Sequence, residues 1–195
     1  ELYGVINGKI YNNSNDKKMG INIYEGSIVK GVIENRCGNI EIYGGTLSKI
    51  TNDFEGTINI RNATTDSIEN SGTINMYSGS VLSSDIAVVN KRTFNLYGGI
   101  IESTESSGIS SSSVTNIGTK GDVDENNNLI VSTESPIVKG KNYGIIDYGK
   151  VNFYDGKIIG QKSISGELYS TEIGYDTVTT IDSNENEVTY LSIKN

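Results

Sequence analysis

The sequence predicts an all-β fold: a single-stranded, right-handed parallel β-helix (β-solenoid) of about eight coils that ends in a C-terminal β-hairpin cap. One short strand-like phrase recurs along the 195-residue chain at intervals of roughly 16 to 20 residues. Isoleucine, asparagine, glycine, serine and threonine dominate the composition, whereas the helix formers alanine and leucine are scarce. Apolar and polar residues alternate within each copy, which is typical of a strand with one buried side.

The repeated phrase reads G-x-Ile-Asn-Ile-Tyr-x-Gly, and aligning its copies gives a tyrosine column: Tyr24, Tyr43, Tyr77, Tyr97 and Tyr154. Further copies place Ile6, Arg61 and Ile117 in the same column. A second column recurs in step, just before the next copy begins: Asn35, Asn52, Asn70 and Asn90. Asparagine tolerates left-handed backbone angles and can hydrogen-bond to its own kind in adjacent coils, so this column predicts a tight corner.

Alternation within the phrase separates the two sides of each predicted strand. The apolar side is expected to form the core: Ile21, Ile23, Ile40, Ile42, Ile58, Ile60, Ile74, Met76, Phe94, Leu96, Val151 and Phe153. The intervening polar residues and the tyrosine column are expected to face outward. Glycine recurs two positions after the tyrosine, where a positive φ lets the chain bend: Gly26, Gly45, Gly79, Gly99 and Gly156. Ala63 breaks this rule.

A coil of about 18 residues is too short for a βαβ unit, which takes about 30 or more. It can hold three short strands, each paired with its counterpart about 4.8 Å away in the next coil, so that eight coils would form a rod about 40 Å long. The drifting intervals favour a right-handed helix over the left-handed hexapeptide type, which needs a strict rhythm.

Two departures from the repeat set the predicted domain organisation. Residues 1–161 are expected to form the coils, with the polar residues 119–134 as a loop inserted in one of them. Residues 162–195 are expected to cap the last coil, because a solenoid must cover its final apolar layer and its unpaired strand edges. This segment ends in two alternating stretches around a Ser-Asn-Glu-Asn turn, which predicts a hairpin.

Composition narrows the partners and the chemistry. The formal net charge of −8 argues against nucleic acid or an anionic membrane surface. No apolar run approaches the roughly 20 residues of a membrane-spanning helix, so membrane insertion is not expected. Cys37 is the one cysteine, so an internal disulfide is excluded and a buried thiol is expected. The chain has no histidine, which excludes histidine-dependent catalysis.

Acidic residues offer little for catalysis or metal binding. Polysaccharide lyases and hydrolases need calcium-binding carboxylates beside a base, or a carboxylate pair, and no acidic cluster recurs in register with an arginine. We therefore predict no catalytic residue and no cofactor. Asp122, Asp124 and Asn126 stand at alternate positions, like the first half of a calcium loop. Because Asn127 and Thr133 replace the required glycine and glutamate, a solvated turn is favoured and Ca²⁺ binding is the alternative.

The outward column is open to two interpretations. Aromatic rings on a flat face can stack against sugars, and an arginine among them can contact a carboxylated or sulfated unit. The candidate ligand-binding residues are Tyr24, Tyr43, Arg61, Tyr77, Tyr97 and Tyr154. Alternatively, rings about 5 Å apart stack on one another and stiffen the sheet.

The C-terminal part of the chain resembles a known group of proteins. The segments NIGTKGD, SPIVKGKNYGIID and VNFYDGKIIGQ, with the terminal TTIDSNENEVTYL, are similar to the end of repeat-rich, pectate-lyase-like parallel β-helix surface proteins of low-GC Gram-positive bacteria. Upstream, only the general YGG repeat is shared. The group more often reads GTKDG, whereas this chain has Gly121 before Asp122. The resemblance implies an exported solenoid of largely uncharacterised role and supplies no catalytic residues.

Three hypotheses of function follow. The first is a non-catalytic structural or adhesive module of an exported bacterial surface protein, presenting a rigid face to a glycan or a protein on a host or cell surface. The second is a carbohydrate-active lyase or hydrolase. The third is a self-assembling or phage-derived fibre module that associates through the solenoid ends, since no cap is evident at Glu1. The expected location is extracellular or at the cell surface.

Overall fold

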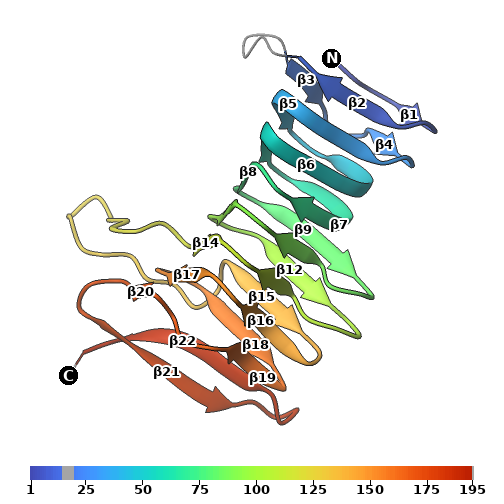
Figure 1. Cartoon of the computed structure of the whole chain (residues 1–195). Coiled ribbons are helices and arrows are strands. Elements are labelled where there is room, and N and C mark those ends of the chain that lie inside the picture. Colours follow the sequence, from blue (N-terminus) through green and yellow to red (C-terminus); the bar gives the residue numbers. More distant parts are fainter. Residues whose placement is uncertain (15–19, 195) are drawn as a thin grey trace.

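The computed structural model of the chain describes residues 1–14 and 20–194 and shows a rod of stacked coils (Figure 1). The described residues form strands and turns and contain no helix, and the coils build a parallel β-solenoid of about eight turns. The predicted all-β solenoid is therefore confirmed. No helix in these residues has the length and apolarity needed to cross a membrane.

Each full coil contributes strands to three faces, and each strand pairs in parallel with its counterpart in the next coil. The tyrosine face contains β3 (Gly20–Ile23), β8 (Thr73–Met76), β11 (Thr93–Leu96), β14 (Val114–Ile117), β17 (Lys150–Phe153) and β20 (Ser170–Thr171). The second face contains β1 (Val5–Ile6), β4 (Ile28–Val29), β9 (Gly79–Ser83), β12 (Ile100–Ser103), β15 (Ile137–Gly140) and β18 (Lys157–Gly160). The third face contains β2 (Ile10–Asn13), β10 (Val88–Asn90), β13 (Ile109–Ser111), β16 (Tyr143–Asp147) and β19 (Lys162–Ser165).

Three long strands bend from one face to the next. They are β5 (Ile33–Ile42), β6 (Gly45–Ile60) and β7 (Ala63–Asn70). Their registers show the bend: β6 pairs with β4 at Leu47, with β7 at Ile50 and with β8 at Ile58. Each of these strands is paired on both sides of a corner, which holds adjacent faces in fixed relation.

The core consists of inward-facing columns with one apolar residue per coil. The predicted core residues are buried in the structure, except that Ile21 is half-buried and packs against the core. The second and third faces add further columns, such as Val29, Leu47 and Val81 on one and Ile33, Ile50 and Ile68 on the other. Phe94 and Phe153 are the largest fully buried side chains.

The glycine turn after the tyrosine column has the predicted conformation. Gly26 and Gly79 have φ of 82° and 102°, a left-handed region that disfavours residues with a Cβ. Ala63 occupies the register position of Gly45 and Gly79, and there the preceding residue, Asn62, takes the positive φ of 53°. The coil with alanine thus makes the same bend one residue earlier.

The predicted asparagine column forms a buried ladder of hydrogen bonds at the corner between the third face and the tyrosine face. Asn12 extends it by one coil. In each step the Nδ2 group donates to the side-chain oxygen of the next coil toward the C-terminus, at 2.8 to 3.2 Å, in the order Asn12, Asn35, Asn52, Asn70, Asn90 and Ser111. These asparagines do not have positive φ. Of the two predicted reasons for the column, hydrogen bonding between coils is confirmed and left-handed geometry is wrong.

Two alignments from the sequence are also wrong. Ile6 pairs with Val29 on the second face, and the first residue of the tyrosine column is instead Tyr3, next to the Leu2–Ile23 bridge. Ile117 is fully buried in register with Leu96, so the column residue of that coil is Gly118. Neither copy has tyrosine at the expected position, so the sequence alignment placed the wrong residue in the column.

The last coils carry the insertion and the cap. No strand is assigned between β14 and β15; an isolated antiparallel bridge joins Val123 and Leu129. β19 pairs in parallel with β16. The predicted hairpin is formed by β21 (Tyr175–Ile181) and β22 (Glu187–Ile193), and β22 lies antiparallel along β18 at the end of the rod (Figure 1).

Candidate functional site

The tyrosine column forms a stack of side chains along one edge of the tyrosine face. Tyr3 and Tyr24 have ring centroids 4.7 Å apart, Tyr24 and Tyr43 5.3 Å, and Tyr77 and Tyr97 5.0 Å, with interplanar angles between 6° and 21°. Tyr3 was missed by the alignment, although Tyr at position 3 is visible two residues before Val5. Each ring therefore has a neighbour against at least one of its faces.

Arg61 fills the gap between the two groups of tyrosines. Its guanidinium carbon lies 4.5 Å from the ring centroid of Tyr77 and 5.8 Å from that of Tyr43. Its Nη1 donates to the Glu41 carboxylate at 3.0 Å. The planar guanidinium thus continues the stack, and Glu41 one coil away balances its charge.

Stacking limits what this column can offer to a ligand. The ring faces of Tyr24 and Tyr43 are covered by neighbours, while ring edges and hydroxyl groups remain outside, with Tyr43 40% and Tyr77 42% exposed. Burial raises the pKa of Tyr97, and the nearby Tyr77 raises it further. The hydroxyl groups of the column form a row that can donate and accept hydrogen bonds.

Tyr154 does not join the stack. Gly118 separates it from Tyr97 in the column, and a Cβ at position 118 would lie 2.3 Å from the Cβ of Asp155. Lys120 approaches the Tyr154 ring instead, with Nζ 5.9 Å from the centroid. Of the six candidate residues, the structure brings five together and leaves Tyr154 two coils away from Tyr97.

A second amide ladder lies beside the tyrosine column on the same face. Here the Nδ2 group donates toward the N-terminus, at 2.5 to 2.8 Å, in the order Asn152, Asn116, Asn95, Asn75, Asn59 and Glu41. Glu41 has only acceptor atoms, so it ends the ladder. These side chains are half-buried. The face is consequently flat, polar and fixed by contacts between equivalent residues.

The calcium-loop candidates have another role in the structure. The Asp124 carboxylate accepts hydrogen bonds from the backbone N–H groups of Asn126 and Asn128, and the Asn128 amide and side chain lower its pKa. This is a turn held by an aspartate. In residues 1–14 and 20–194, no group of three or more acidic, histidine or cysteine side chains is placed to hold a metal ion.

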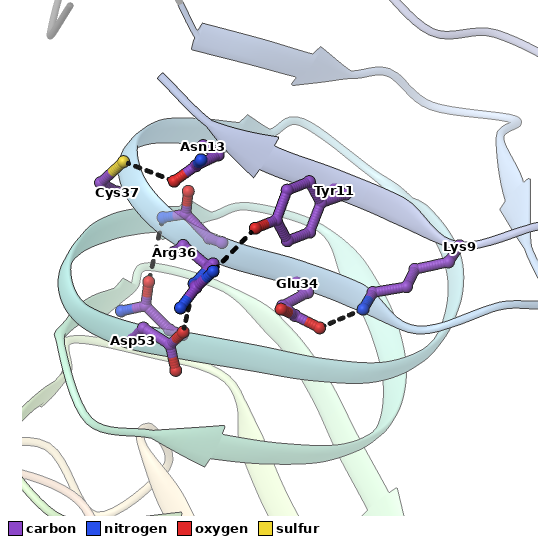
Figure 2. A network of polar contacts seen from close by, with 9 residues as sticks. Lys9, Tyr11, Asn13, Glu34, Arg36, Cys37 and Asp53 are labelled. Carbon is purple, nitrogen blue, oxygen red and sulfur yellow. Dashed lines mark hydrogen bonds and ion pairs between the residues drawn. The ribbon is translucent and has the colours of Figure 1, made fainter. Parts of the chain in front are cut away.

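The corner between the third face and the tyrosine face carries a network of polar side chains in the first coils (Figure 2). Arg36 lies between Tyr11, whose hydroxyl accepts from Nη1 at 3.2 Å, and Asp53, whose carboxylate is 3.8 Å from Nε. Next to them the Cys37 thiol donates to Asn13 Oδ1 at 3.3 Å. The thiol is buried, as expected from the sequence. The network ties three successive coils together.

Beside this network the longest of the neighbouring corners forms a cleft. Residues 53–56 lie between Asn52 and Thr57, whereas only residues 71–72 lie between Asn70 and Thr73 in the next coil. With the coil before it and the two coils after it, the longer corner encloses a hollow of about 570 Å³. It is lined by Cys37, Gly38, Phe54, Glu55, Gly56, Thr57, Thr73 and Arg92.

Arg92 closes this cleft from two coils away. Its guanidinium lies over the Phe54 ring, 3.8 Å from the centroid, and its Nη1 donates to the Phe54 carbonyl. In the sequence no acidic cluster recurs in register with Arg92, and Phe54 lies outside the repeated columns. The sequence does carry one signal for the cleft. The number of residues between the asparagine column and the next strand is larger in this coil.

Comparisons with known proteins do not assign the chain to a family. No protein-family model, curated protein or solved structure matches it.

Proposed function

We propose that the chain is a non-catalytic structural and adhesive module of an exported bacterial surface protein, which presents a rigid lateral surface to a glycan or protein partner. The observation that carries the proposal is the construction of the tyrosine face. Its outward side chains are locked into a stack and an amide ladder that run from coil to coil. A surface already ordered before binding loses little side-chain entropy when a partner docks.

The surface offers hydrogen bonds rather than a deep pocket. Tyrosine hydroxyls stand in a row about one coil apart, and Arg61 adds a guanidinium in the middle. Such a row fits an extended partner with many polar groups, for which contacts repeat along the rod. The resemblance of the C-terminal segments to exported surface proteins supports the proposed location.

Binding of the purified chain to panels of immobilised glycans and surface proteins tests the proposal. We expect saturable binding to at least one member, and none by the Ile42→Asp variant, which cannot form the core. Absence of binding to both panels would contradict an adhesive role. Release of sugars from a polysaccharide panel, measured as new reducing ends or unsaturated products, would contradict the non-catalytic part.

A further inference from the structure

Phe54 differs from the column tyrosines in what covers its ring. Arg92 lies over one face of the ring, yet the residue remains 65% exposed. Tyr24 and Tyr43, in contrast, have their ring faces against one another. Because a neighbour occupies only one side of Phe54, the opposite face of this ring is open to a ligand.

The cleft beside Phe54 supplies polar groups of both kinds. Glu55 offers acceptor atoms, Arg92 offers donors, and the hydroxyls of Thr57 and Thr73 can do either. In the described part of the chain, these two hydroxyls make no hydrogen bond to protein. Its volume, about 570 Å³, falls within the roughly 300 to 1,000 Å³ of small-ligand sites.

The cleft suits a ligand that combines an apolar surface with hydroxyl groups, and the charged side chains around it indicate whether that ligand is neutral or charged. At the corner the carboxylates of Asp53 and Glu55 are balanced by the guanidinium groups of Arg36 and Arg92, while the whole chain carries a net charge of −8. The Arg92 guanidinium is already engaged by the Phe54 carbonyl. A corner without net charge favours a neutral ligand, and the net charge of the whole chain disfavours the approach of a polyanion.

We infer that the Phe54 cleft binds one neutral hexopyranose unit of a glycan, with an apolar sugar face on the open side of the ring and the sugar hydroxyls hydrogen-bonded to Glu55, Thr57 and Thr73. This inference rests on the proposed function, which gives the module a glycan or protein partner. It places the sugar-stacking ring on the corner loop rather than in the tyrosine column.

The test is binding of the full chain to an array of neutral polysaccharides (glucans, galactans and mannans) and acidic ones, followed by titration of the best binder. Phe54→Ala should weaken binding at least tenfold, while Phe54→Tyr, which keeps the ring, should stay within threefold of the parent. Tyr148→Ala is the matched control, because Tyr148 is a 76% exposed aromatic at the same corner of a later coil. Its affinity should not change.

Three further results decide the inference. Binding to neutral glycans should be nearly independent of salt between 50 and 500 mM, because no net charge is neutralised. Retained binding by a folded Phe54→Ala variant, or loss of binding by Tyr43→Ala/Tyr77→Ala alone, overturns the cleft but leaves the proposed function standing. A glycan array on which the parent chain binds nothing neutral also overturns the cleft, whereas the proposed function fails only if the protein panel is blank as well.

Discussion

The coils from Gly20 to Ile117 consist of stacked parallel strands, whereas the residues from Gly118 onward add a loop and an antiparallel cap and are held by different contacts. In the first region the polar columns repeat one residue type, so asparagine donates to asparagine and tyrosine stacks on tyrosine. In the second region the half-buried ladder reaches Asn152, and glutamates make further contacts. Glu172 there accepts a hydrogen bond from the Gly121 N–H at 2.7 Å, and Glu187 accepts from Ser163. A ladder forms where one polar residue type repeats from coil to coil in addition to the apolar core.

The largest contrast between the regions should come from charge in the core. Ile42 is fully buried between Ile23 and Ile60, so Ile42→Asp places an unpaired carboxylate in the stack. We expect a loss on the order of 4 kcal/mol or more, enough to prevent folding. Ile193→Asp in the cap, where the isoleucine is 69% exposed, should change stability by less than about 0.5 kcal/mol. Circular dichroism melts of both variants check this, and a normal melt for Ile42→Asp would contradict the inward assignment.

The next effect distinguishes the buried ladder from the half-buried one. Asn70→Ala removes the acceptor of Asn52 and the donors to Asn90 and the Thr93 carbonyl. The cost should be about 2 to 3 kcal/mol, because buried groups lose their partners. Asn152→Ala, at the end of the half-buried ladder, should cost less than about 1 kcal/mol. Urea unfolding measures both, and equal losses would show that burial does not set the value of a ladder step.

A smaller difference is expected along the tyrosine column. Tyr43→Ala removes contacts with Tyr24 on one side and Arg61 on the other, which should cost about 1 to 2 kcal/mol. Tyr154→Ala removes the approach of Lys120 and the packing of a half-buried ring but no ring stacking, and should cost less than about 1 kcal/mol. Thermal melts of the pair test this. If Tyr154→Ala proved the more damaging change, stacking would not be what stabilises the column.

The smallest effect is a pH dependence confined to the second region. Burial raises the pKa of Asp155, so the folded chain holds this proton more tightly than the unfolded chain. Its contribution to stability is therefore greatest below the ordinary carboxyl pKa and is lost as pH rises through that value toward the raised one. Asp155→Asn keeps an oxygen to accept from Ser132 and Gly156.

Unfolding of Asp155→Asn in urea between pH 3 and 7 tests this sign. The variant should gain stability relative to the parent as pH rises. If the free energies of unfolding of Asp155→Asn and the parent differed by the same amount at every pH, burial would not raise the pKa of Asp155.

The sequence was sufficient for the fold of the first region because the same packing problem recurs in every coil. Alternation identified the inward isoleucines, and the asparagine column identified a corner whose ladder the structure confirms. The register failed at Tyr3 and Gly118, where the column residue deviates and only coil-to-coil pairing reveals the position. The sequence of one strand does not determine which residue of the adjacent coil pairs with it.

The cleft was not predictable on the same basis. Phe54 and Arg92 are 38 residues apart and meet because a longer corner in one coil projects over the shorter corners of the next two. Periodicity identifies features that all coils share, whereas this cleft depends on the extra corner residues of a single coil. Unequal corner lengths are visible in a sequence only after the strands have been aligned correctly.

The opposite directions of the two amide ladders have an electrical consequence. In the buried ladder each donor points toward the C-terminal end of the rod, and in the half-buried ladder each donor points toward the N-terminal end. Every peptide-like amide carries a dipole of about 3.5 D, so one ladder alone would accumulate partial charge of opposite sign at its two tips. With five asparagine donors in each direction, the two sums largely cancel. The two ladders together add little polarity along the rod, so further coils with both columns can be added without the amide dipoles building up partial charge at the ends.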